Sequence, residues 1–175
     1  MKKSITLILF ALISSHIFSQ QSIKWYTIQE AEKLYKKEPR PIFVDTYTDW
    51  CGWCKKMDRE TFTNPVISDI LTNKFYPVKF NAEGKESITF FGQNYVNDGK
   101  SGSAHQLAVA LLKGQMSYPT VVFIVPNKDG TPGAEPVPGF REAKDMEVLL
   151  SFFADKAYIT QTWEAFQKTF QGKVK

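Results

Sequence analysis

Cys51 and Cys54 are the only cysteines of the 175-residue chain, and two residues separate them in the stretch TDWCGWCKKM (residues 48–57). Two thiols at this spacing can form a redox-active disulfide, supply half of a metal site, or act as a structural crosslink. A disulfide between them closes a very small loop, which restricts the unfolded chain little and adds little stability. Small exported proteins that use disulfides structurally tend to carry several pairs. The pattern therefore favours a chemical role for this pair.

A metal site would need ligands beyond the two thiols. A structural zinc site normally has four protein ligands, and the chain offers two histidines, His16 and His105. His16 lies in an N-terminal segment that we expect to be removed, and His105 is typical of a polar position on a helix. Zinc is therefore disfavoured, while binding of copper(I) by the two thiols stays open as an alternative.

The elements predicted around the motif put Cys51 at the beginning of a helix. Residues 41–48 (PIFVDTYT) are rich in β-branched and aromatic side chains, which indicates a buried strand, and residues 52–62 are compatible with a helix. Free N–H groups and the positive end of the helix dipole stabilise a thiolate at a helix N-terminus. We therefore expect Cys51 to be the exposed nucleophile and Cys54 the shielded resolving thiol.

The first 19 residues have the layout of a signal peptide. Lys2 and Lys3 precede an apolar run over residues 5–13, which is too short to span a bilayer, and a cleavage site is expected after Ser19. Removing Lys2 and Lys3 from the 22 basic side chains leaves 20 against 18 acidic ones, and no basic cluster suggests nucleic-acid binding. We predict a protein that is exported to the periplasm or secreted, is not embedded in the membrane and binds no nucleic acid.

Residues 20–175 are predicted to form a single domain. Besides the strand and helix around the motif, we predict strands at 23–26, 75–81, 119–125 and 134–138, and helices at 28–37, 65–71, 142–158 and 163–170. Thr27 with Glu30 is a capping box for the first helix, and Asn64 before Pro65 caps the helix that follows the motif. The prolines of 134–138 place that strand at a sheet edge.

The segment 82–117 is longer than a simple connection and is predicted to be a largely helical insertion. It contains a predicted helix over 86–95 and a second one that Ser103 caps and Gly114 ends. The order of elements implies an α/β fold, a three-layer α/β/α sandwich with a mixed central sheet, this enlarged helical insertion and an extra C-terminal helix.

Around the two cysteines the sequence resembles the thioredoxin superfamily. The motif W-C-G-W-C-K (50–55) is similar to the thioredoxin W-C-G-x-C-K, and the likeness extends over residues 40–155. Asp45 matches the buried aspartate of thioredoxins, Lys79 the lysine that pairs with it, and Pro119 the cis-proline. Gly139 matches the glycine after the final hairpin. The motif is closest to exported thioredoxin-like proteins and to the reducing domains of membrane thiol:disulfide interchange proteins.

The resemblance assigns roles to the matched residues. Asp45, with a pKa raised by burial, would take the proton of Cys54, and Lys79 would tune that transfer; alternatively, the pair only holds two strands together. Five residues would form the substrate surface: Trp50, Gly52, Trp53, Tyr118 and Pro119. Trp53 stands where thioredoxin has proline, which leaves the direction of electron flow open.

The resemblance implies an exported thiol–disulfide oxidoreductase that reduces or isomerises protein disulfides through the Cys51–Cys54 couple. It would need neither a metal nor a cofactor, and its partners would be protein thiols and disulfides and a membrane thiol-reducing electron donor. Two alternatives stay open: a thiol oxidase of the same fold, and a non-enzymatic module that binds a partner or handles copper(I).

Overall fold

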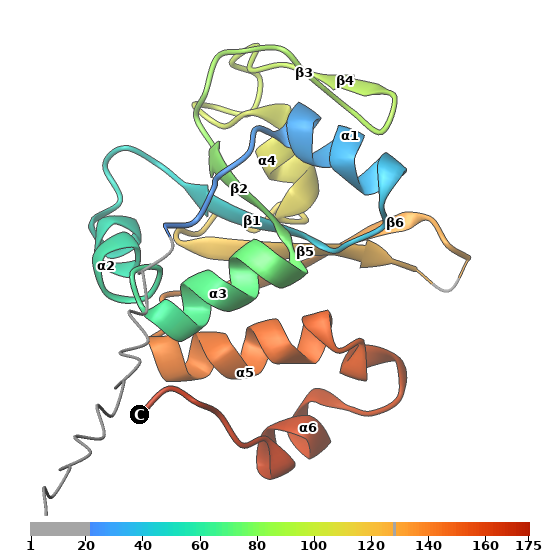
Figure 1. Ribbon diagram of the computed structural model, residues 1–175. Coiled ribbons are helices and arrows are strands. Elements are labelled where there is room, and N and C mark those ends of the chain that lie inside the picture. The colour runs from blue at the N-terminus through green and yellow to red at the C-terminus, as the bar shows by residue number, and fades with distance from the viewer. Residues whose placement is uncertain (1–21, 128) are drawn as a thin grey trace, which may run out of the picture.

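A computed structural model describes residues 22–127 and 129–175, so the predicted signal peptide (1–19) lies outside the described residues. At its centre is a four-stranded mixed sheet of order β2-β1-β5-β6 (Figure 1). β1 (Ile42–Tyr47) runs parallel to β2 (Tyr76–Asn81) and antiparallel to β5 (Thr120–Pro126), which pairs with β6 (Pro132–Pro138). The thioredoxin-like three-layer α/β/α arrangement expected from the sequence is confirmed.

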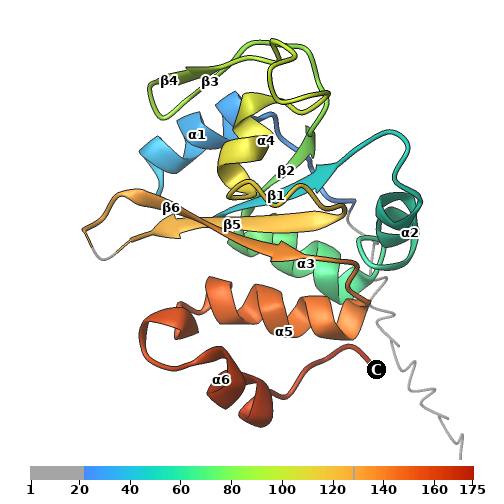
Figure 2. The same cartoon turned by 180° about the vertical axis from the view of Figure 1, so that it is seen from behind.

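Helices cover both faces of the sheet. On one face lie α1 (Ile28–Lys37) and α4 (Gln106–Leu111), and on the other α2 (Gly52–Glu60), α3 (Pro65–Lys74) and α5 (Ala143–Ala154) (Figures 1 and 2). A short 3-10 turn (Ala157–Ile159) leads to α6 (Trp163–Thr169), which packs outside α5. The capping box of Thr27 and the Asn64 cap before Pro65 form as predicted.

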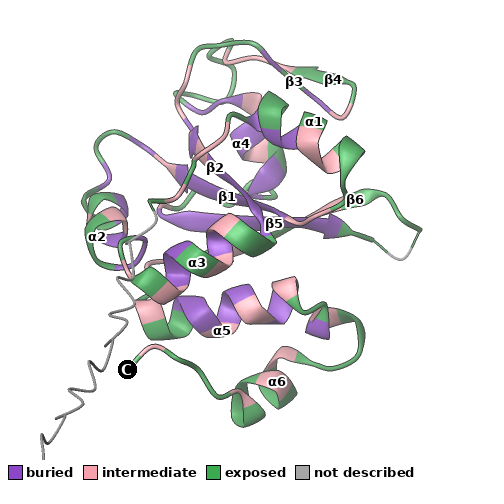
Figure 3. Cartoon of the chain, in the orientation of Figure 1, coloured by how far each residue is buried: buried purple, intermediate pink, exposed green. Residues whose placement is uncertain are grey.

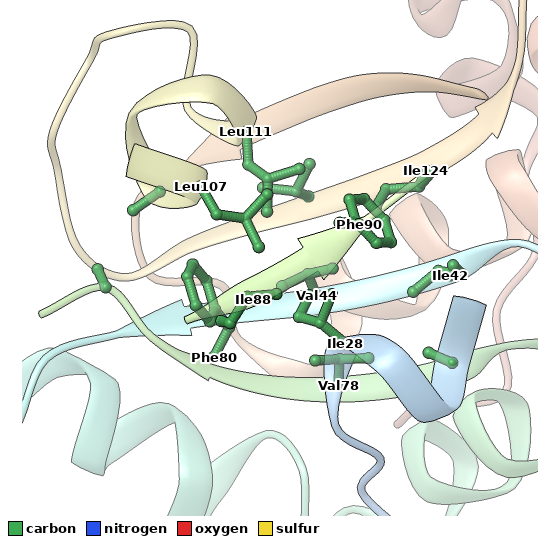
Figure 4. Packing of buried hydrophobic residues seen from close by; sticks show 14 of the residues in the cluster. Ile28, Ile42, Val44, Val78, Phe80, Ile88, Phe90, Leu107, Leu111 and Ile124 are labelled. Carbon is green, nitrogen blue, oxygen red and sulfur yellow. The ribbon is translucent and has the colours of Figure 1, made fainter. Parts of the chain in front are cut away.

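Two hydrophobic cores lie on the two sides of the sheet, because successive residues of a strand point to opposite faces. Val44 of β1 belongs with Val78 of β2 and Ile124 of β5 to the core under α1 and α4 (Figure 4). Phe43 packs with Phe123 in the core under α2, α3 and α5. The two inner strands, β1 and β5, are therefore buried along almost their whole length (Figure 3).

β6 is an edge strand, as its prolines predicted. Gly139 donates its N–H to Pro119 O, and Thr131 O accepts the Asn127 N–H. The odd-numbered residues of β6 therefore point their backbone groups toward β5. The residues that alternate with these point their backbone groups toward the outer edge of the sheet. Three of them are prolines, which have no N–H: Pro132, Pro136 and Pro138. This edge offers few donors to a further strand.

The insertion differs from the prediction. Residues 86–95 do not form a helix but a hairpin of β3 (Ile88–Phe90) and β4 (Gln93–Tyr95). Its two turn residues, Phe91 and Gly92, both have positive φ, as a tight hairpin turn requires. In β3 the first and third residues are buried and the middle one is exposed, a period of two that fits a strand.

Three predicted boundaries are also corrected. Residues 23–26 contribute a single bridge, between Tyr26 and Val78, rather than a strand. The helix α4 begins after His105, whose ring accepts the Leu107 N–H, and not after Ser103. The helix predicted to reach residue 158 ends at Ala154, because Lys156 adopts a left-handed conformation.

Candidate active site

The two cysteines form a disulfide at the N-terminus of α2, directly after β1 and the turn that follows it. Cys51 is the N-cap of α2, and its Sγ accepts the Cys54 N–H at 3.0 Å. The Cys51 N–H donates to Thr48 O at 3.1 Å, which holds the turn against the helix. The first sulfur therefore lies among the free N–H groups of the helix end, where a thiolate is stabilised.

The expectation that Cys51 is exposed is wrong for the disulfide form. Cys51 is 4% and Cys54 2% exposed, so accessibility does not separate the two residues. Cys54 lies on the buried face of α2 with Met57, and the bond to Cys54 draws the Cys51 sulfur toward that face. The two cysteines differ instead in their place on the helix, since Cys51 caps it and Cys54 lies inside its first turn.

Asp45 and Lys79 form a partly buried ion pair across neighbouring parallel strands. They are directly opposite in the register of β1 and β2, and Lys79 Nζ donates to Asp45 Oδ2 at 2.6 Å. Asp45 is fully buried, and its Oδ1 has no hydrogen-bond partner among the described residues. Burial raises the pKa of Asp45 to about 6, against the opposing effect of the Lys79 charge. Asp45 therefore exchanges its proton near neutral pH.

Asp58 completes this cluster and was missed from the sequence. It lies on α2, one turn after Cys54, and accepts a second hydrogen bond from Lys79. Its side chain is 43% exposed, whereas that of Lys79 is 24% exposed. Burial lowers the pKa of Lys79, but the charges and hydrogen bonds of Asp45 and Asp58 outweigh it and raise that pKa overall. The spacing of four residues from Cys54 on a predicted helix was the available signal.

Two exposed tryptophans flank the disulfide, Trp50 at 67% and Trp53 at 58% exposure. Trp50 meets Tyr118 edge to face at 5.9 Å, and the Tyr118–Pro119 peptide bond is cis. Trp53 lies 5.3 Å from the ring of Phe140, a residue that sequence reasoning missed. Each tryptophan of the motif is thus paired with an aromatic residue from one end of the β5–β6 hairpin.

A positive charge lies beside the pair of Trp53 and Phe140. The ammonium of Lys56 lies 5.1 Å from the Trp53 ring and 5.0 Å from the Phe140 ring. Gly139, with φ of +95°, makes the turn that leads from β6 to Phe140, and its N–H donates to Pro119 O at 2.8 Å. The matched glycine therefore positions the partner of Trp53.

The insertion, residues 82–117, contacts Trp50 on the other side of the disulfide. Trp50 Nε1 donates to Glu83 Oε2 at 3.1 Å, and Ser103 Oγ donates to Glu83 Oε1 at 2.6 Å. Asn97 Nδ2 donates to the main-chain oxygens of Glu83, Gly84 and Ser103. The segment 82–117 therefore fixes the orientation of one motif tryptophan.

His105 is fully buried, and both nitrogens of its ring are engaged. Nδ1 accepts the Leu107 N–H at 3.0 Å, and Nε2 lies 2.9 Å from Glu86 O. Within residues 22–127 and 129–175, no group of three or more His, Cys, Asp or Glu side chains is arranged to hold a metal ion. No helix in these same ranges is long and apolar enough to cross a membrane.

Fold and site together define the class of the protein as thioredoxin-like, with a CxxC disulfide at a helix N-terminus. The solution structure of a thioredoxin from Thermus thermophilus superposes with a TM-score of 0.57 at 21% identity, covering 78% of this chain and 90% of that one. A structure described as DsbH oxidoreductase superposes with a TM-score of 0.54 at 19% identity, covering 85% of this chain and 95% of that one. At these identities the likeness establishes the fold.

The chain belongs to the Thioredox_DsbH family, described as "Protein of unknown function, DUF255", whose model matches residues 12–173. Human spermatogenesis-associated protein 20 is 31% identical over 90 residues, 51% of this chain and 12% of that protein. The thiol:disulfide interchange protein DsbD of Pectobacterium atrosepticum is 25% identical over 127 residues, 73% of this chain and 19% of that protein. The chain thus spans less than a fifth of the length of either relative.

Proposed function

We propose that this protein is an exported thiol–disulfide oxidoreductase that reduces or isomerises disulfides of other proteins. The observation that carries the proposal is the Cys51–Cys54 disulfide at the N-terminus of α2, with the ion pair of Asp45 and Lys79 beneath that helix. Export is supported by the basic and apolar pattern of residues 2–13.

The reaction begins with the reduced protein. The Cys51 thiolate attacks one sulfur of a substrate disulfide, forms a mixed disulfide with it and releases the other substrate sulfur as a thiolate. The N-cap position lowers the cost of keeping Cys51 ionised, because its sulfur accepts a helix N–H and faces the positive end of the dipole. No metal or cofactor takes part in this step.

Asp45 serves the second step, in which the substrate is released. The Cys54 thiol gives its proton to the Asp45 carboxylate, directly or through water, and the resulting thiolate attacks the Cys51 sulfur. The Cys51–Cys54 disulfide forms, and the second substrate sulfur leaves as a thiolate, so the substrate has gained two electrons. A membrane partner with a dithiol would return two electrons and two protons to the cysteine pair.

The direction of reduction is supported by the pairing of Asp45 with Lys79, which resembles the reducing members of the superfamily. The motif has no histidine between its cysteines, which would have favoured a strongly stabilised thiolate and an oxidising protein. An oxidase of the same fold is the nearest alternative, and the reduction potential separates the two.

The substrate surface consists of the aromatic walls on both sides of the disulfide. Trp50 with Tyr118 forms one wall, and Trp53 with Phe140 forms the other. Exposed aromatic rings of this size bind apolar side chains well. We therefore expect the substrates to be extended polypeptide segments with apolar residues beside the cysteine, as in unfolded or misfolded proteins.

Reduction of insulin by dithiothreitol in the presence of the protein tests the proposal. We expect catalysis by the wild type and none by Cys51→Ser, while Cys54→Ser should accumulate mixed disulfides through Cys51. Cys51→Ser is the matched control, because it keeps one thiol but removes the nucleophile. Absence of turnover and of trapped partners, together with tight copper(I) binding by the reduced protein, would instead identify a copper-handling module.

A further inference from the structure

Trp25 belongs to the segment before α1 and lies outside the cysteine motif and the residues matched to the family pattern. The next residue, Tyr26, donates its N–H to Pro77 O at 2.8 Å and bridges Val78. β2 is the edge strand on this side of the sheet, so the segment is attached along the outer edge of the strand that carries Lys79.

The two aromatic residues of this segment point to opposite sides of the sheet. Tyr26 packs against the core under α1 and α4, and Trp25 against the core under α2, α3 and α5. The Trp25 ring lies edge to face with Phe62 at 5.2 Å and tilted to Phe43 at 6.5 Å. Trp25 therefore reaches the face of the sheet on which α2 and the cysteines lie.

Three aromatic rings surround the ammonium of Lys79 on this face. Nζ lies 5.3 Å from the centre of the Trp25 ring, 5.2 Å from that of Tyr47 and 5.5 Å from that of Phe62. Such rings attract a cation through their electron-rich faces, tryptophan most strongly. Because the segment lies along the outer edge of β2, the Trp25 ring reaches the ammonium from that edge of the sheet.

We propose that Trp25 is a positioning residue that holds the Lys79 ammonium against Asp45 and so sets how readily Asp45 takes up a proton. The relevance of that proton to turnover rests on the proposed function, but the positioning itself does not. The segment that precedes α1 would then tune the redox site from outside the motif.

The direction of the effect follows from the charges around Asp45. In the oxidised protein the titratable groups around Asp45 are Lys79 on β2, Asp58 on α2 and Tyr47 on β1. Of these, the Lys79 cation is the one that favours the ionised form of Asp45. Without the Trp25 ring the ammonium can turn toward solvent and Asp58, and Asp45 then keeps its proton to a higher pH.

NMR titration of the Asp45 carboxyl carbon in the oxidised full chain measures this effect directly. Trp25→Leu fills the space without a ring and should raise the titration midpoint by about half a pH unit, the size expected for one partly buried cation–π contact. Trp25→Phe keeps a ring and should shift it less. Trp163→Leu, on α6, is the matched control and should leave the midpoint unchanged.

A double-mutant cycle with Lys79→Met decides whether Trp25 acts through the lysine. In the Lys79→Met background we expect Trp25→Leu to produce no further shift. An unchanged or lowered midpoint in Trp25→Leu, or the same shift with and without Lys79, overturns the proposal. The titration needs no turnover, so failure of insulin reduction would refute the proposed function and leave this result standing.

Discussion

Replacement of Asp45 by asparagine should stabilise the oxidised protein at neutral pH and leave it unchanged at acid pH. Asp45 is fully buried, and its pKa rises from 3.8 in the unfolded chain to about 6 in the folded protein. The folded protein therefore binds a proton that the unfolded chain has already lost between these two pH values. The contribution of protonated Asp45 to the free energy of unfolding is fully present below pH 3.8 and is lost as the pH rises toward 6.

The size of the effect follows from the shift. A difference of about two pKa units corresponds to about 3 kcal/mol at 1.4 kcal/mol per unit, with no discount for solvent because the group is inaccessible. Lys79 does not compete in this window, because its raised pKa affects stability only at alkaline pH. Asparagine resembles protonated aspartate, so Asp45→Asn should be more stable than the wild type by about 3 kcal/mol at pH 7.5 and equal to it near pH 4.

Urea denaturation of both oxidised proteins between pH 4 and 8 measures this difference. Exposed carboxyl groups with lowered pKa, such as Glu30 and Asp98, titrate alike in both proteins and cancel. Asp58→Asn is the matched control, since it removes the other carboxylate on Lys79 and leaves Asp45 buried. A constant difference between the free energies of unfolding of wild type and Asp45→Asn across this pH range would refute the reasoning. So would a loss of stability of Asp45→Asn relative to wild type as the pH rises toward neutral.

Three further substitutions each test a local contact of the site or of the fold. Phe140→Ala removes the partner of Trp53 and should raise the KM for insulin about two- to tenfold, while the rate with a small aromatic disulfide stays unchanged in steady-state assays. His105→Ala removes the cap of α4 and the contact of the buried ring with Glu86 O, and should lower the free energy of unfolding by about 2 to 4 kcal/mol, whereas His105→Asn should retain the share of the cap, about 1 kcal/mol, as measured by urea denaturation. Glu147→Ala leaves two N–H groups of the C-terminal tail without their acceptor and should cost about 1 to 3 kcal/mol, with Glu147→Gln as the control in thermal unfolding.

Much of the fold could be predicted from local signals. The capping box at Thr27, the Asn64–Pro65 start and the apolar strand before the motif each depend on a few neighbouring residues, and each matches the structure. The hairpin of residues 88–95 could not be predicted as readily, because its strands are three residues long and its turn contains a phenylalanine with positive φ. This hairpin is held by contacts with α1, where Glu32 accepts the Phe91 N–H and Tyr35 meets the Phe91 ring, and such tertiary contacts are not visible in the sequence.

The motif and its matched residues were predictable because the family pattern fixes their order and spacing. Glu83 and Phe140 were missed because each reaches the site through tertiary structure rather than through a motif. Asp58 lies one turn after Cys54 on the same helix, but only the fold shows that it contacts Lys79. Trp25 lies before α1, outside the motif, and the attachment of its segment to the edge of β2 brings it to Lys79. Exposure of Cys51 was mispredicted, since its bond to Cys54 turns the sulfur toward the core.

The reduction potential of the Cys51–Cys54 couple distinguishes a reductant of protein disulfides from a thiol oxidase. Equilibration of the full chain with glutathione or dithiothreitol buffers, followed by quantification of the two thiols, gives this value. A reductant of protein disulfides should lie near the potential of thioredoxin, about −270 mV. A value near that of DsbA, about −120 mV, would contradict the account and identify a thiol oxidase.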